Sequence, residues 1–301
     1  MEDFEDRVAF ITGGASGAGF GQARVFGAAG CRIAIADVRQ DALDDAVATL
    51  ATQGIDAFPV TLDIRDRDAY ARAADAVEDH FDAPVTLLFN TAGVNGFGAL
   101  EEATYADFDW ILGVNFGGVV NGMQTFVPRM IAAGRGGHIV SVASMAGFEG
   151  NPTAGIYAAS KAAVMNLMES YAIALAPHGI GVSTLCPASV RSDIANALDR
   201  RPDELASGSS FRDDPRFIDA QRRLYAGGMD PIELAGHVRT AIEENLLYVL
   251  PFTETREGVR AHFDRVLSFY DAYDTDPAAA DGRARAFLRY REEAQALRES
   301  P

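Results

Sequence analysis

Residues 7–37, RVAFITGGASGAGFGQARVFGAAGCRIAIAD, decide the fold of this chain. An apolar run at residues 7–12 leads into a glycine-rich segment with helical spacing, and a second apolar run follows at residues 32–37. Apolar runs bounded by charged residues and glycines predict buried strands. Two such strands joined by a helix predict parallel pairing, because parallel strands need a crossover connection.

The same alternation continues along the chain. Further helices are expected at residues 40–53, 66–81, 105–133, 156–176 and 231–244, and further strands at residues 56–63, 85–90, 138–143, 180–186 and 247–252. This pattern predicts an α/β fold with a doubly wound parallel sheet and helices on both faces. We expect a single domain over residues 1–252, followed by a helical C-terminal extension over residues 253–301.

One segment breaks the pattern. Residues 188–228 are polar and show no clear period. A loop of that length inside a compact domain is usually a lid or a binding loop, so we expect a substrate lid there.

Composition limits the possible partners. A net charge of −17 disfavours nucleic acids and anionic membranes, which both reward basic patches. No apolar run approaches the ~20 residues of a membrane span, and the acidic start does not resemble a signal peptide. Cys31 and Cys186 lack metal-like spacing, and the five histidines occur singly. We therefore expect a cytoplasmic protein with reduced cysteines, no membrane or nucleic-acid partner and no metal site.

The segment TGGASGAG, residues 12–19, lies between the first strand and the first helix, where backbone amides can receive a pyrophosphate. Asp37 ends the second strand, where a carboxylate can bind the adenosine ribose hydroxyls and repel a 2′-phosphate. NAD is thus favoured over NADP, although Arg39 could meet such a phosphate, stack on adenine or be a simple surface residue. The cofactor contacts expected from these strand ends are Thr12, Gly13, Ser16, Gly17, Gly19, Asp37, Asp63, Ile64, Asn90, Ala92 and Gly93.

Lys161 is the only lysine among 26 basic residues. Tyr157 lies four residues earlier, so the two side chains share one helix face, where a cation can lower the pKa of the phenol from roughly 10. Ser144 precedes Tyr157 by thirteen residues. A hydroxyl, a phenol and an amine together form a candidate catalytic set.

With these segments identified, residues 5–250 resemble the short-chain dehydrogenase/reductase family. The resemblance rests on TGGASGAG, on Asn90-Thr91-Ala92-Gly93, on Asn115 and Ser144, and on Tyr157 and Lys161 as YxxxK. It implies a Rossmann fold in which Ser144 polarises the substrate oxygen and Tyr157 exchanges the proton. It also implies that Lys161 lowers the tyrosine pKa and holds the cofactor ribose, and that Asn115 supports a water relay.

The chain departs from the family pattern at one place. The family usually has a glycine after the proline that ends the sixth strand, whereas here Pro187 is followed by Ala188. The resemblance implies that the nicotinamide end of the cofactor is contacted by Pro187, Val190 and Ser192. It also implies cofactor contacts for Tyr157 and Lys161.

Several segments, among them GGASGAGFGQA, FNTAGVNGFG and YVLPFTETREGV, are similar to bacterial Cα-dehydrogenases that oxidise the benzylic alcohol of lignin-derived β-aryl ethers. This resemblance implies NAD-dependent oxidation of a bulky aromatic secondary alcohol. Apolar residues near the catalytic set suggest an aromatic-sized pocket, and two polar neighbours are candidates for binding a polar substituent. The candidate substrate residues are Val94, Phe97, Met145, Phe148, Pro152 and Ile156, with Glu149 and Asn151 as the polar pair.

Two other functions stay open. One is an NAD(P)-dependent ketone reductase or hydroxysteroid dehydrogenase that uses the same residues. The other is a non-catalytic dinucleotide-sensing protein, because a fold does not determine a function. The broad apolar face at residues 105–133 predicts core or subunit packing rather than a ligand wall. Together with the face at residues 156–176 and the family resemblance, it suggests a homodimer or homotetramer.

Overall fold

The computed structural model describes residues 3–206, 208–209, 211, 215–273 and 276–299. The chain divides into two compact units, residues 1–255 and 256–301. The first unit contains the sheet and its covering helices. The second consists of α10 (Arg256–Ser268), the short turn η7 (Phe269–Ala272) and α11 (Pro277–Glu299), so the C-terminal region is helical as predicted.

Seven parallel strands form one sheet in the described part of the chain, in the order β3-β2-β1-β4-β5-β6-β7. This order confirms the predicted doubly wound sheet. It reverses between β1 and β4, and in such sheets ligands bind in the crevice at the carboxyl ends of the strands flanking that point. The strands are β1 (Val8–Thr12), β2 (Arg32–Asp37), β3 (Ala57–Thr61), β4 (Val85–Asn90), β5 (Gly137–Val142), β6 (Ile180–Leu185) and β7 (Tyr248–Val249).

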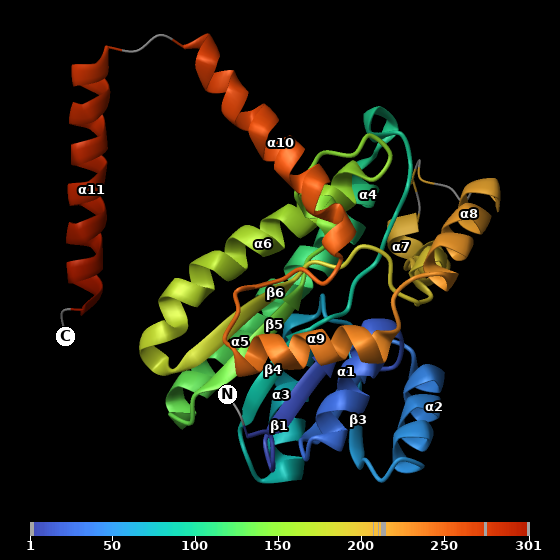
Figure 1. Ribbon diagram of the computed structural model, residues 1–301. Coiled ribbons are helices and arrows are strands. Elements are labelled where there is room, and N and C mark those ends of the chain that lie inside the picture. The colour runs from blue at the N-terminus through green and yellow to red at the C-terminus, as the bar shows by residue number, and fades with distance from the viewer. Residues whose placement is uncertain (1–2, 207, 210, 212–214, 274–275, 300–301) are drawn as a thin grey trace. The chain divides into compact units, whose positions relative to one another are not determined.

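Helices cover both faces of the sheet (Figure 1). Side chains alternate along each strand, so Val8 and Phe10 join the core on one face and Ala9 and Ile11 join the core on the other. The first core is closed by α3 (Arg67–Phe81), α5 (Gly118–Ala133) and α6 (Gly155–Leu175), and the second by α1 (Gly17–Ala28), α2 (Gln40–Ala51) and α9 (Pro231–Glu243).

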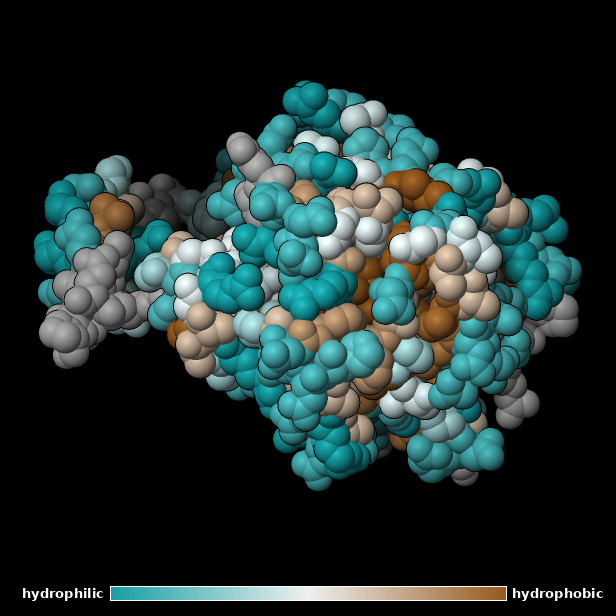
Figure 2. All heavy atoms as spheres, turned by 90° about the horizontal axis from the view of Figure 1, so that it is seen from below, coloured by the Kyte–Doolittle hydropathy of each residue, from teal (hydrophilic) through white to brown (hydrophobic). Residues whose placement is uncertain are grey.

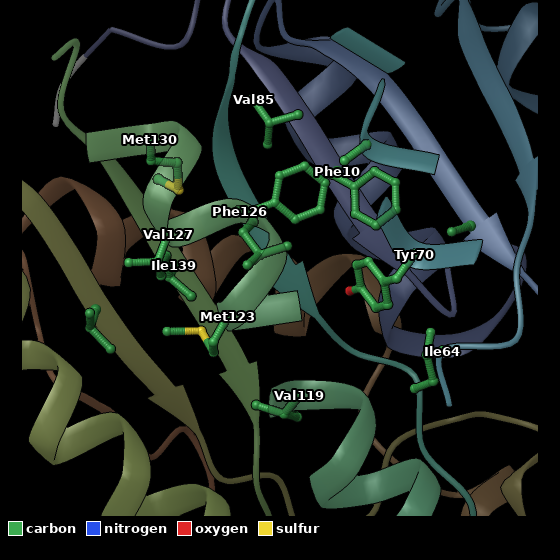
Figure 3. Packing of buried hydrophobic residues seen from close by; sticks show 14 of the residues in the cluster. Phe10, Ile64, Tyr70, Val85, Val119, Met123, Phe126, Val127, Met130 and Ile139 are labelled. Atoms are coloured by element: carbon green, nitrogen blue, oxygen red, sulfur yellow. The ribbon is translucent and has the colours of Figure 1, made fainter. Parts of the chain in front are cut away.

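Aromatic packing anchors the first core. The ring of Phe10 from β1 lies 4.8 Å from that of Phe126 on α5 and 5.9 Å from that of Tyr70 on α3. Figure 3 shows these rings together, with Met123 and Met130 filling the space along α5. Burying a side chain of this size stabilises the fold by about 1.5–3 kcal/mol, so this contact fixes both helices against the sheet.

Two predictions of local structure need correction. The helix expected over residues 105–133 is α4 (Tyr105–Leu112) and α5, separated by a π-helical turn, η2 (Gly113–Gly117). Such turns insert an extra residue into the helix and occur frequently at functional sites.

The expected loop at residues 188–228 contains η5 (Ile194–Arg200), α7 (Asp203–Ala206) and α8 (Pro215–Ala226). Its buried apolar residues among those described, Val190, Ala195, Ala197, Phe211 and Ile218, are too irregularly spaced to show a period. Of the predicted lid, residues 207, 210 and 212–214 lie outside the described residues.

The remaining short turns are η1 (Leu100–Glu102), η3 (Met145–Gly147), η4 (Ala176–His178) and η6 (Thr253–Thr255). On the face shown in Figure 2, hydrophilic residues prevail and hydrophobic ones form smaller patches between them. None of the helices in the described ranges has the length and apolar character needed to cross a membrane.

Candidate active site

The turn between β1 and α1 is held tight by glycines. Gly13 has a φ of +64°, and a Cβ atom there would lie 2.9 Å from the Cα of Ala92. At Gly19 a Cβ atom would collide with the carbonyl oxygen of Gly13. Side chains are thus excluded where this turn meets the segment after β4. The amides at the start of α1 are left facing the crevice, where they favour an anionic ligand.

Thr12 ties the first and fourth strands together at their carboxyl ends. Its hydroxyl accepts hydrogen bonds from the backbone amides of Thr91 and Ala92 at 3.0 and 3.1 Å, and donates to the carbonyl oxygen of Phe89 at 3.2 Å. Asn90 donates to the hydroxyl of Ser141 at 3.1 Å and so links β4 to β5. Thr12 and Asn90 therefore shape the floor of the crevice from beneath.

Charged pairs mark the ends of the second and third strands. Asp37 is 8% exposed, and the guanidinium of Arg39 binds both of its carboxylate oxygens, at 3.0 and 3.2 Å. Arg39 also donates to the hydroxyl of Ser16 at 3.0 Å. Asp63 pairs in the same way with Arg65, at 2.7 Å.

Ser144, Tyr157 and Lys161 come together where β5 and α6 meet. The Lys161 amine is buried and donates to the carbonyl oxygen of Val142 at 2.7 Å. It lies 5.7 Å from the centre of the Tyr157 ring, and the Tyr157 hydroxyl forms a hydrogen bond with Ser144. Gly93 lets the chain pass close by, because a Cβ atom there would lie 3.4 Å from the Lys161 Nζ.

Burial is the largest influence on the pKa values of Tyr157 and Lys161. It raises the pKa of Tyr157 to about 12, and the hydrogen bond with Ser144 opposes that rise. Burial also lowers the pKa of Lys161 to about 8. The expected lowering of the phenol pKa by Lys161 is therefore not found in the protein by itself. A desolvated phenol beside an amine and a hydroxyl is nevertheless a set that can exchange a proton with a ligand oxygen.

Asn115 lies in the π-helical turn and is fully buried. Its amide forms two hydrogen bonds with the backbone of Val94: Oδ1 accepts from the amide at 2.8 Å and Nδ2 donates to the carbonyl at 2.9 Å. Nδ2 also donates to the hydroxyl of Ser160 at 3.1 Å. In this structure Asn115 thus fixes the segment after β4 against α6.

A cavity of about 240 Å³ lies next to these groups. Tyr157 and Lys161 line it, whereas Ser144 and Asn115 lie behind its wall together with Thr12 and Asn90. The other predicted cofactor residues line it as well: Gly13, Ser16, Gly17, Gly19, Asp37, Asp63, Ile64, Ala92, Gly93, Pro187, Val190 and Ser192. Residues that the sequence predicted at the ends of four separate strands therefore line one cavity.

The predicted substrate residues are mostly elsewhere. Val94 lines the cavity, while Ile156 packs behind it beside Tyr157. Met145 and Phe148 pack against the core between the sheet and α6. Asn151 accepts hydrogen bonds from the backbone of the following turn. In the described structure Phe97, Met145, Phe148, Glu149, Asn151 and Pro152 are not part of the cavity wall.

Sequence reasoning missed other wall residues, among them Trp110, Arg200 and Tyr225. Trp110 belongs to the apolar face at residues 105–133, which the sequence pattern assigns to core or subunit packing. Tyr225 follows Ile218 and Gln221 at helical spacing inside the polar segment, and this spacing is the signal that could have revealed it. Arg200 has no comparable signal.

Comparisons with known proteins agree with this geometry. The sequence pattern described as short chain dehydrogenase matches residues 7–203. A protein named C alpha-dehydrogenase from Sphingobium sp. (strain NBRC 103272 / SYK-6) is 51% identical over 290 residues, which are 96% of this chain and 95% of that protein.

Solved structures are similar over comparable lengths. The crystal structure of the LigD apo form from Sphingobium sp. strain SYK-6 is 49% identical with a TM-score of 0.76, covering 91% of this chain and 100% of that one. A short chain dehydrogenase/reductase from Burkholderia phymatum in complex with NAD is 35% identical with a TM-score of 0.84, over 92% and 99% of the two chains. The likeness thus extends over both the sheet and most of the remaining chain.

Proposed function

The chain belongs to the short chain dehydrogenase family, and from this premise we propose that it oxidises a bulky benzylic secondary alcohol to the ketone with NAD as cofactor. The observation that carries the proposal is that Tyr157 and Lys161 line one cavity, with Ser144 behind its wall next to Tyr157, beside a glycine turn suited to a pyrophosphate. The benzylic substrate is supported by the 51% identity to the Sphingobium protein.

The residues present fit NAD. The glycine turn leaves room for a pyrophosphate against the amides of α1, because side chains there would collide with neighbouring backbone. Asp37 stands where the adenosine ribose would lie and disfavours a 2′-phosphate. The similar Burkholderia structure is described as a complex with NAD. When bound, NAD supplies the hydride acceptor.

Each catalytic side chain then has a task. Ser144 donates a hydrogen bond to the substrate oxygen and holds it beside Tyr157. The Tyr157 phenolate removes the hydroxyl proton, and general acid-base help of this kind is typically worth ~10²–10⁴ in rate. Lys161 holds the ribose and places positive charge beside the phenol. Asn115 keeps Val94 and α6 in position, which maintains the wall next to Tyr157.

The test is NADH formation with three kinds of alcohol: aryl-ether alcohols, simple benzylic alcohols and steroids. We expect turnover of the aryl-ether alcohols. Tyr157→Phe is expected to retain NAD binding, measured by fluorescence titration, and to lose turnover. Undiminished activity in that variant would refute the assignment of Tyr157. Turnover of steroids in preference to aryl ethers would favour a hydroxysteroid dehydrogenase.

We also propose that the enzyme is a cytoplasmic homodimer or homotetramer. Tyr105 on α4, Ile131 on α5 and Ile173 on α6 are apolar and exposed, which supports association through this side of the first unit. Cys31 and Cys186 are buried and free, which suits a reducing compartment. Light scattering tests the oligomeric state, and cell fractionation tests the location.

A further inference from the structure

A second tyrosine shares the cavity with Tyr157. Tyr225, on α8, lines the wall and is partly buried. It is close enough to Tyr157 to act on it electrostatically. Apolar residues, among them Trp110, Val94 and Val114, belong to the same wall. A phenol in such surroundings is a directional polar contact.

The face of α8 that carries Tyr225 holds further polar atoms. Ile218, Gln221 and Tyr225 follow each other at intervals of three and four, so they share one side of the helix. Gln221 is 6% exposed, and neither its amide nitrogen nor its amide oxygen has a hydrogen-bond partner among the described residues. Buried polar atoms without partners are costly and call for an explanation.

Asn95 sets the direction of the Tyr225 hydroxyl. It is 5% exposed and forms a hydrogen bond with that hydroxyl. Its Oδ1 has no partner in the part of the chain that the structure describes. Burial raises the pKa of Tyr225 and this bond opposes the rise, as a bond donated to the phenol oxygen does, so the Nδ2 of Asn95 is the donor. The proton of the Tyr225 hydroxyl is left free to bond elsewhere.

We propose that Tyr225 donates this proton to a substrate oxygen next to the carbinol carbon, an ether or second hydroxyl oxygen, and so selects oxygen-substituted alcohols. Asn95 is the positioning residue. Because its Nδ2 donates to the Tyr225 oxygen from one side, the proton of the Tyr225 hydroxyl is directed into the cavity. The unpaired amide of Gln221 adds a polar group on the same helix face. The inference rests on the proposed alcohol oxidation and adds a specificity determinant to it.

A matched pair of substrates tests the proposal: a benzylic alcohol with an aryl-ether oxygen on the neighbouring carbon, and its analogue with CH₂ in place of that oxygen. The wild-type enzyme should prefer the ether in kcat/KM by about fivefold, as expected for one neutral hydrogen bond. Tyr225→Phe should remove the preference by lowering kcat/KM for the ether alone. Tyr290→Phe, at an exposed position on α11, is the control.

A second variant tests the direction of the bond. In Asn95→Asp the carboxylate can accept the Tyr225 proton, so the ether preference should be lost although the phenol is still present. NAD binding should be unchanged in every variant and reports on folding. A wild-type enzyme that turns over neither alcohol would contradict the proposed function. Turnover with no ether preference, or an equal loss for both substrates in Tyr225→Phe, would overturn the role of Tyr225 and leave the proposed function intact.

Discussion

Replacing Asp107 by asparagine should weaken the structure around the active site. Asp107 on α4 is fully buried, and its Oδ1 accepts a hydrogen bond from Arg201 at 2.7 Å. Ser209 donates to the same oxygen, while the Thr104 backbone amide donates to Oδ2 at 2.8 Å. The Arg201 guanidinium lies 5.1 Å from the Trp110 ring. This cluster ties the segment after β6 to a helix whose tryptophan lines the cavity.

The magnitude follows from burial. The side chain of Arg201 is 3% exposed, and its Nε and Nη2 have no partner among the described residues. Asp107→Asn keeps the shape of the side chain but leaves this buried charge uncompensated, which typically costs about 3–5 kcal/mol. For a domain of this size each kcal/mol lowers Tm by about 2–4 °C, so we expect a fall of roughly 6–20 °C.

Lowering the pH should also remove the stabilisation that the Asp107 carboxylate provides. Burial alone raises the pKa of Asp107, but hydrogen bonds from Ser209, Arg201 and Thr104 outweigh it and hold the pKa well below its usual range. A carboxylate with a depressed pKa contributes stability that is present above its unfolded pKa of about 3.9 and is lost as pH falls further. The acid-induced loss of stability should therefore be smaller in Asp107→Asn than in the wild type.

Thermal unfolding followed by circular dichroism measures the effect, and the KM for the alcohol reports on the cavity. Asp109→Asn, exposed on the same helix, is the matched control. Removing both charges, as in Asp107→Leu with Arg201→Met, should recover most of the stability, because no unpaired charge is left. A Tm for Asp107→Asn equal to that of Asp109→Asn would refute the reasoning.

Three further predictions concern other parts of the first unit. In Gly98→Ala the new Cβ atom would overlap the ring of Phe211, so the variant should lose about 1–3 kcal/mol of stability in urea unfolding, and the same change made in a Phe211→Ala chain should cost little further stability. Burial lowers the pKa of His138 to about 3. The unfolded chain therefore gains a proton below pH ~6.5 that the native state does not. Wild-type stability should fall from pH 7 to pH 5, and His138→Gln should lack this contribution. Asp37→Ser releases Arg39 from its carboxylate pair, so the ratio of kcat/KM for NADP to that for NAD should rise.

The order of strands and helices was predictable because parallel strands are buried on both faces and appear as unbroken apolar runs. Val8–Thr12 begins with such a run, VAFI, and each of its residues is buried. The glycine turn and the spacing of Tyr157 and Lys161 are local features, and local spacing survives in a linear sequence. The cofactor side of the cavity was accordingly predictable.

The substrate side depends on contacts between distant segments. Arg201 meets Asp107 across 94 positions, and Tyr225 meets Asn95 across more than a hundred. No period or motif encodes such pairs. Nearness in sequence was also misleading, since Phe148 lies four residues after Ser144 and yet packs into the core. The wall of the cavity comes from separate segments, with Trp110 on α4 and Tyr225 on α8.

The acid-base pair shows what a sequence pattern leaves undetermined. Burial places the pKa of Tyr157 at about 12 and that of Lys161 at about 8, which inverts their usual order of proton affinity. Between these values the phenol keeps its proton while the amine has lost its own. A phenolate near neutral pH therefore needs more than Lys161. The hydrogen bond with Ser144 opposes the rise in the Tyr157 pKa, and the positive charge of an oxidised nicotinamide ring would favour the phenolate further if it were bound in the cavity. In the proposed reaction Tyr157 would therefore remove a proton most readily with the hydride acceptor bound, and an arginine at position 161, which stays charged at any working pH, could not take part in this balance.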